Sequence, residues 1–239
     1  MKPYRDEGSK KEQVREMFDN IAPTYDTLNH TLSAGIDRWW RRRTVRIVKR
    51  SRPQRVADIA AGTGDLAIAL AKAMPQCRVT GIDLSEGMLR IARGKAAGAG
   101  VDGRVEFVCG DAERLQFADG EFDAVTVAFG VRNFGDIPAG LREICRVLRS
   151  GGQVAILELS IPRNRIIRWL YGLYSHTVMP LLGGAVSRDR AAYRYLPESV
   201  EEFPSPEKFL NIMAEAGYVA CRYKSLTFGT ARIYLAEKP

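Results

Sequence analysis

The sequence has few of the residues that bind metals or form disulfides. Its 239 residues include four cysteines and two histidines. The cysteines, at positions 77, 109, 145 and 221, are more than 30 residues apart, and no CxxC pair occurs. This spacing argues against a zinc site and against a disulfide framework. We therefore expect no bound metal and a reducing, cytoplasmic environment.

Long apolar runs are also scarce. The first ten residues are polar and charged, without the apolar centre of a secretory signal. Residues 169–187 contain no charged side chain, but they include Pro180 and the pair Gly183-Gly184. A helix there would be broken, and 19 residues barely reach the length of a membrane span. We expect an apolar lid or a membrane-contacting segment, not a span.

Acidic residues are outnumbered, since 36 basic and 28 acidic side chains give a net charge of +8. The excess is concentrated in Arg38–Arg55, which has nine basic residues and no acid. This tract has three readings: a solvated helix face, a nucleic-acid patch or a membrane-surface patch. The solvated face is the commonest meaning of such a tract, but a second basic and aromatic segment, Arg163–Tyr171, adds weight to peripheral contact with an anionic membrane, at the inner face of the cytoplasmic membrane. No nucleic-acid-binding module is recognisable, so we expect no nucleic-acid partner. A monomer and a homodimer are both compatible with the sequence.

The middle of the chain alternates short Val- and Ile-rich runs with helical patterns. The expected strands are Arg55–Ala60, Arg78–Asp83, Val105–Cys109, Phe122–Phe129, Gly152–Leu159, Tyr218–Ser225 and Ala231–Ala236. The expected helices include Leu66–Ala73, Gly87–Ala97, Ile137–Leu148 and Pro206–Ala216, and a helix around Val14 to Ile21 precedes them. Alternating strands and helices predict a Rossmann-like α/β domain, a mostly parallel sheet with helices on both faces. We divide this single domain, 1–239, into an N-terminal helical lid (1–53), a core (54–160), a substrate-binding insertion (161–206) and closing elements (207–239).

A glycine-rich turn follows the first expected strand, in the run Asp58-Ile59-Ala60-Ala61-Gly62-Thr63-Gly64-Asp65. Such a turn leads into a helix at the carboxyl end of the sheet, where open α/β sheets bind ligands. Through Ala67 it also fits the dinucleotide pattern, so an NAD(P)-binding oxidoreductase is the alternative. A carboxylate such as Asp65 would repel a pyrophosphate but attract the sulfonium and ammonium groups of S-adenosyl-L-methionine. We therefore predict S-adenosyl-L-methionine as cofactor, held by Asp58, Gly62, Thr63, Gly64 and Asp65.

Two further aspartates follow the next strands. Asp83 comes 19 residues after Gly64, where a carboxylate can accept both ribose hydroxyls. Asp111 can accept a hydrogen bond from the adenine amino group, and the N–H of Ala112 can reach a ring nitrogen. Individually, Asp83 is also compatible with a helix cap and Asp111 with a turn residue. Together they support an adenosine site.

From Gln54 to Leu159 the chain resembles class I S-adenosylmethionine methyltransferases, whose sheet has seven strands with the last antiparallel. A narrower resemblance covers nearly the full length. Tyr25-Asp26-Thr27-Leu28-Asn29-His30-Thr31-Leu32-Ser33, Phe129-Gly130-Val131-Arg132-Asn133 and Tyr193-Arg194-Tyr195-Leu196-Pro197-Glu198-Ser199 are similar to segments of the ubiquinone/menaquinone biosynthesis C-methyltransferases. The chain departs from that pattern at Asp37, where a histidine is usual, and at Ala128, where a serine is frequent.

The resemblance implies C-methylation of a prenylated quinol, with demethylmenaquinol favoured as acceptor; methylation of another small aromatic molecule is the alternative. Arg132 and Asn133 follow the fourth expected strand, where Arg132 would stabilise a phenolate or order a water that takes the proton, and Asn133 would fix its geometry. Arg132 is also compatible with a solvated loop cation. His176 is a candidate proton acceptor, or else a structural histidine. Tyr25, Tyr193 and Tyr195 are candidate substrate-binding residues, and each is also compatible with simple packing.

Overall fold

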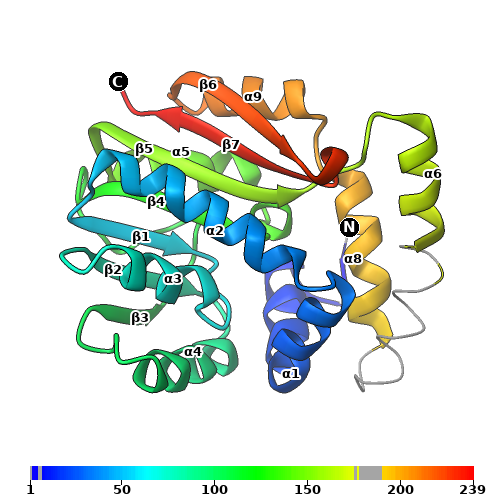
Figure 1. The fold of residues 1–239 in the computed structure, drawn as a ribbon, viewed down its shortest axis with the longest axis horizontal. Coiled ribbons are helices and arrows are strands. Elements are labelled where there is room, and N and C mark those ends of the chain that lie inside the picture. The colour runs from blue at the N-terminus through cyan, green and yellow to red at the C-terminus, as the bar shows by residue number, and fades with distance from the viewer. Residues whose placement is uncertain (1, 5–6, 175–176, 178–189) are drawn as a thin grey trace.

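The computed structural model describes residues 2–4, 7–174, 177 and 190–239, with the backbone only at residues 190 and 193. Its centre is one seven-stranded sheet of order β3-β2-β1-β4-β5-β7-β6 (Figure 1). The strands are β1 (Arg55–Ile59), β2 (Arg78–Asp83), β3 (Val105–Cys109), β4 (Phe122–Ala128), β5 (Leu148–Leu159), β6 (Val219–Leu226) and β7 (Ala231–Glu237). Only β7 runs antiparallel to its neighbours. The predicted mostly parallel sheet with an antiparallel last strand is confirmed.

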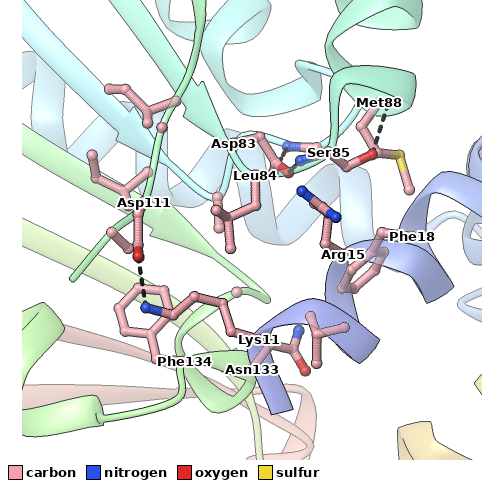
Figure 2. A pocket seen from close by; sticks show the side chains of 18 of the residues that line it. Lys11, Arg15, Phe18, Asp83, Leu84, Ser85, Met88, Asp111, Asn133 and Phe134 are labelled. Carbon is pink, nitrogen blue, oxygen red and sulfur yellow. Dashed lines mark hydrogen bonds and ion pairs between the residues drawn. The ribbon is translucent and has the colours of Figure 1, made fainter. Parts of the chain in front are cut away.

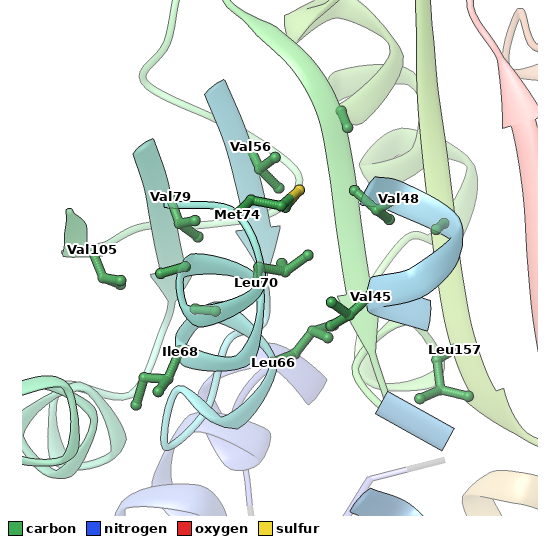
Figure 3. Close-up of a cluster of buried hydrophobic side chains, with 14 of the residues drawn as sticks. Val45, Val48, Val56, Leu66, Ile68, Leu70, Met74, Val79, Val105 and Leu157 are labelled. Carbon is green, nitrogen blue, oxygen red and sulfur yellow. The ribbon is translucent and has the colours of Figure 1, made fainter. Parts of the chain in front are cut away.

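The central strands are apolar because both of their faces are covered. In β1, Val56, Ala57 and Ile59 are almost wholly buried, and β4 is buried along most of its length. On one face lie α2 (Ile36–Val48), α3 (Asp65–Ala73) and α4 (Glu86–Gly98), whose side chains join one core cluster (Figure 3). On the other lie α5 (Ile137–Val147) and α9 (Pro206–Glu215).

The first helix is longer than the sequence predicts. We expect a helix around Val14 to Ile21, but α1 (Lys10–Leu32) starts earlier and continues through Pro23. A capping box formed by Ser9 and Glu12 begins it. Leu28 and Leu32, beyond the proline, are buried in a cluster with Met88 of α4. This burial stabilises the second half of the helix and places α1 across the carboxyl edge of the sheet.

Other boundaries also shift by a few residues. The basic tract forms most of α2 and a short 3-10 turn, Lys49–Ser51, which Arg52 ends with a positive φ of 51° directly before Pro53. Strand β5 begins at Leu148, four residues before the expected Gly152, because a register irregularity carries the pairing with β4 past the glycines. The expected insertion contains α6 (Arg165–Leu173) and α8 (Arg190–Glu202). Within the described residues, every helix is too short or too polar to cross a bilayer.

Candidate active site

A first cavity lies at the carboxyl ends of the central strands, beneath α1 (Figure 2). It is formed by residues from the ends of four parallel strands and from one face of α1. Its walls from the sheet side include Gly62, Asp83, Ser85, Asp111, Ala112, Phe129 and Asn133, and α1 contributes Lys11, Val14, Arg15, Phe18 and Tyr25. Four predicted cofactor residues, Gly62, Asp83, Asp111 and Ala112, are therefore brought together.

Asp83 is fixed at the end of β2 by backbone hydrogen bonds. Its Oδ2 accepts from the N–H of Gly62 at 2.8 Å, and its Oδ1 accepts from the N–H of Ser85 at 2.9 Å. Gly62 has a positive φ of 55°, which the turn needs to aim this N–H at the carboxylate. Burial raises the pKa of Asp83 despite these bonds. The result is an oriented carboxylate, suited to accept hydrogen bonds from a ribose diol.

Asp111 reaches the same cavity but is already paired. Lys11 of α1 donates to its Oδ2 at 2.6 Å and to Glu113 at 2.8 Å (Figure 2). The Asp111 Oδ1 accepts from the N–H of Glu113 at 2.9 Å. Helix α1 is thus held over the cavity by an ion pair to a residue we predict to contact adenine.

The other predicted cofactor residues do not line this cavity. Asp58 is only 1% exposed, and the Thr126 hydroxyl donates to it at 2.6 Å within the sheet. Burial raises the pKa of Asp58 to about 7. Thr63 donates to Asp26, and Gly64 is needed because a Cβ there would lie 2.7 Å from the Phe107 ring. Asp58, Thr63, Gly64 and Asp65 are therefore not lining residues of this cavity, and their contact with the cofactor stays a prediction.

Asp65 faces away from the cavity because cations attract its carboxylate. Lys95 of α4 lies 2.5 Å from Asp65 Oδ1, while Arg41 and His30 lie within 4 Å of Oδ2. Although burial acts to raise it, Arg41 and Lys95 lower the pKa of Asp65. Because Asp65 does not line this cavity, its position gives no support to repulsion of a pyrophosphate at this corner.

Asp65 belongs to a larger ion-pair cluster between α1, α2, α3 and α4. The His30 Nδ1 lies 2.8 Å from Asp37 Oδ2, and the His30 Nε2 lies 3.6 Å from Asp65 Oδ2. Ligand atoms of His30, Asp37 and Asp65 lie within 4.8 Å of one another, as a metal site would require. Arg41 and Lys95 already neutralise the two carboxylates, so we interpret this group as a set of ion pairs.

A second cavity adjoins the first. Tyr25 and Phe129 line both. The second cavity has about 960 Å³ of empty space and a largely apolar wall. Besides these two residues, it is lined by Asn29, Leu32, Ser33, Ile36, Asp37, Trp40, Arg41, Arg132, Leu159, Tyr171, Tyr174, Leu196, Thr227 and Thr230. Two ligands placed in the two cavities would meet at Tyr25 and Phe129.

Arg132 and Asn133 lie at this meeting point, in the 3-10 turn Val131–Asn133 after β4. Arg132 lines the second cavity and Asn133 the first. The Arg132 Nη1 donates to Glu158 at 2.8 Å and to the carbonyl of Phe129, and its Nε donates to Ser199 at 3.2 Å. In the hydrogen bonds among the described residues, Nη2 is not used. The buried guanidinium is thus held by three partners with one amino group left over for a ligand.

The predicted substrate-binding tyrosines and His176 lie in different places. Tyr25 lines both cavities, as a substrate-binding residue requires. Tyr195 is buried, and its hydroxyl donates to the Asn133 side chain at 3.2 Å, so it supports the site from behind. His176 lies outside the described residues, and of Tyr193 only the backbone, in α8, is described.

Several lining residues are not predicted from the sequence. Arg15 and Phe18, which line the first cavity, lie in a helix that we predict from its apolar residues without assigning it a ligand. Arg41, which lines the second cavity, lies in the tract that we interpret as a charged surface. The available signal for Arg41 is its i, i+4 spacing from Asp37, which indicates an ion pair on one helix face. Tyr171 belongs to the apolar-basic segment that we connect with a membrane, and no local pattern distinguishes it.

Comparison with known proteins decides the family. The ubiE/COQ5 methyltransferase family matches residues 6–238. The chain belongs to this family. It is 45% identical to a demethylmenaquinone methyltransferase of Bacteroides fragilis over 238 residues, covering 100% of this chain and 97% of the relative. It is 48% identical to one of Thermus thermophilus, covering 93% of this chain and all of the relative.

Solved structures agree on the fold. A SAM-dependent methyltransferase of Thermotoga maritima, described as a possible histamine N-methyltransferase, superposes with a TM-score of 0.64. It is 18% identical, and the match covers 95% of this chain and all of that one. The predicted class I methyltransferase fold is confirmed, and family membership makes the chain a methyltransferase.

Proposed function

We propose that the chain transfers a methyl group from S-adenosyl-L-methionine to a ring carbon of a prenylated quinol, with demethylmenaquinol as the favoured acceptor. The observation that carries the proposal is the pair of adjoining cavities, which share Tyr25 and Phe129, in a chain of the ubiE/COQ5 methyltransferase family. Its relatives from Bacteroides fragilis and Thermus thermophilus are named demethylmenaquinone methyltransferases, and they match 100% and 93% of this chain. Membership of a methyltransferase family favours this donor over NAD(P).

The first cavity fits the donor. The Asp83 carboxylate is oriented for a ribose diol, and Asp111 and the N–H of Ala112 lie where an adenine edge would be bound. When bound, S-adenosyl-L-methionine supplies an electrophilic methyl group. Phe129 and Tyr25 then place the acceptor ring beside it, and the apolar second cavity excludes water from the ring.

Arg132 supplies the electrostatic part of the mechanism. Ionising a quinol hydroxyl makes the neighbouring ring carbon more nucleophilic, and the resulting oxygen anion needs a hydrogen-bond donor in an apolar cavity. Arg132 Nη2 is available for that oxygen, while Glu158 and Ser199 hold the rest of the guanidinium in place. The products are the methylated quinol, S-adenosylhomocysteine and a proton.

In this proposal, helix α6 binds the cytoplasmic face of a membrane. Its Ile166 and Trp169 side chains are 71% and 67% exposed, and Leu170 and Leu173 are more than half exposed. Arg165 and Arg168 belong to the same helix, and Tyr171 on it lines the second cavity. Exposed apolar and basic side chains together suit an anionic lipid interface. A prenyl tail can thus stay in the bilayer while its ring enters the cavity.

The direct test offers purified protein methyl-labelled S-adenosyl-L-methionine with reduced demethylmenaquinol or with the demethylated ubiquinol precursor. We expect label in demethylmenaquinol, and label in neither lipid would overturn the proposal. The Arg132→Lys variant keeps the charge beside Glu158 but loses the second amino group, so kcat/KM should fall roughly 100-fold. As a matched control, Arg222→Lys changes an exposed arginine and should leave kcat/KM within about twofold.

A further inference from the structure

One wall of the second cavity is polar although most of the cavity is apolar. It is formed by Ser33, in the turn between α1 and α2, and by Asp37 in the first turn of α2. Among the described lining residues of this cavity, Asp37 is the single carboxylate. The mechanism above does not use it. From this wall we infer that Ser33 and Asp37 form a subsite for the second hydroxyl group of a hydroquinone acceptor, an inference that rests on the proposed function.

The carboxylate of Asp37 is held rigidly. Its Oδ1 accepts from the Ser33 hydroxyl at 2.6 Å, and its Oδ2 faces His30 Nδ1 at 2.8 Å and also pairs with Arg41. Arg41 is itself fixed, because its guanidinium lies over the Phe129 ring at 5.2 Å. These contacts come from several sides and fix the rotamer of a residue that is only 4% exposed. A preorganised group of this kind loses little entropy when a ligand binds.

The pair is an acceptor for a hydroxyl proton. Although burial acts to raise it, Ser33 and Arg41 lower the pKa of Asp37, so the group is a carboxylate and accepts only. A carboxylate offers about four lone-pair positions, and three are used by Ser33, His30 and Arg41. The Ser33 hydroxyl donates its proton to Asp37, so the Ser33 oxygen can also accept a hydrogen bond. One O–H donor entering the cavity would complete this arrangement.

The acceptor chemistry supplies that donor. A hydroquinone has two hydroxyl groups on opposite ring positions, and the methylated carbon is adjacent to only one of them. Arg132, from the turn after β4, serves the adjacent oxygen, and the Ser33–Asp37 wall comes from a different element. Leaving the remote hydroxyl without an acceptor in an apolar cavity would weaken binding. The subsite therefore selects a hydroquinone over a phenol with a single hydroxyl.

The test compares two acceptors with each enzyme. One is a short-chain prenylated 1,4-naphthohydroquinone, kept reduced, and the other lacks only the hydroxyl remote from the methylated carbon. The measured quantity is the ratio of kcat/KM for the first to that for the second. The intrinsic difference in ring reactivity is the same for each enzyme and cancels when ratios are compared. The fraction of folded enzyme cancels as well, so a destabilised variant still gives an answer.

We expect the wild-type ratio to exceed that of Asp37→Ala by about 10- to 100-fold, because a hydrogen bond to a charged group is lost. Asp37→Asn keeps an acceptor oxygen and should give an intermediate ratio, and Ser33→Ala a smaller decrease. Asp119→Asn, which changes a carboxylate 79% exposed at the surface, should match the wild type. Equal ratios in wild type and Asp37→Ala would overturn the subsite while leaving the proposed function intact. Methylation of neither acceptor by the wild type would instead contradict the proposed function.

Discussion

Asp83 and Asp65 flank the same glycine-rich turn but have opposite surroundings. Asp83 accepts backbone hydrogen bonds at the floor of the first cavity, whereas Asp65 is turned toward Lys95 and Arg41. We expect Asp83→Asn to weaken binding of S-adenosylhomocysteine by roughly 10- to 100-fold, since charge-assisted hydrogen bonds are lost. Isothermal titration calorimetry measures this.

Asp65→Asn is the matched control for that measurement. Its carboxylate does not line the first cavity, so we expect the affinity to change by less than about threefold. An Asp65 variant that binds the ligand as poorly as the Asp83 variant would show that Asp65 acts on the cofactor after all.

Asp58 makes stability depend on pH. Burial raises its pKa from 3.8 to about 7, so the folded state binds this proton more tightly than the unfolded state does. The contribution of Asp58 to the free energy of unfolding therefore decreases as pH rises from about 4 to about 7, by at most about 4 kcal/mol. Asp58→Asn removes the titration, so wild type should lose stability relative to the variant across this interval. Urea unfolding at pH 4.5, 6 and 8 measures the difference.

Asp65→Asn again serves as the comparison. Its pKa is lowered, so its contribution is complete above the unfolded pKa and is lost only as pH falls below about 4. The difference between wild type and Asp65→Asn should stay constant from pH 4.5 to 8. A wild-type curve parallel to that of Asp58→Asn over the same range would be inconsistent with a buried, protonated Asp58.

At the scale of elements, periodicity predicts the core strands and helices closely but does not predict orientation at their ends. The Val- and Ile-rich runs of β1, β2, β3 and β4 are predicted to within one residue, because burial on both faces requires such runs. The direction of the Asp65 side chain depends instead on Lys95, 30 residues away, and on Arg41 of another helix. Similarly, the passage of α1 through Pro23 depends on burial against α4. These are tertiary effects without a local signal.

Helix α6 carries the prediction of membrane contact. Trp169→Ser combined with Ile166→Ser removes its two most exposed apolar side chains, and binding to anionic vesicles should fall roughly tenfold or more. Sedimentation with phosphatidylglycerol-containing vesicles measures this. Phe228→Ser is the matched control, because Phe228 is 81% exposed on the 3-10 turn Thr227–Gly229. Equal loss in both variants, or no wild-type binding at moderate salt, would contradict a specific role for α6.

For the whole molecule, the sequence predicts the fold class and the antiparallel last strand, and four of the eight predicted cofactor residues line the first cavity. It does not predict that two cavities adjoin, because their walls combine residues from α1, α2, α4, α6 and α8 with residues from the ends of β1 to β5 and from the turn after β6. Arg132 is predicted from its position after β4, but its partners Glu158 and Ser199 are 26 and 67 residues away. Contacts at such separations depend on the folded topology, which periodicity specifies only in outline.

If the proposed function is right, donor and acceptor occupy these two cavities and meet at Tyr25 and Phe129. A crystal structure with S-adenosylhomocysteine and a short-chain naphthohydroquinone would reveal both positions. We expect the ribose on Asp83, the quinol ring in the second cavity with one oxygen at Arg132, and the sulfur facing the ring between Tyr25 and Phe129. A ring bound outside the second cavity, or a sulfur pointing away from the two shared residues, would contradict the account.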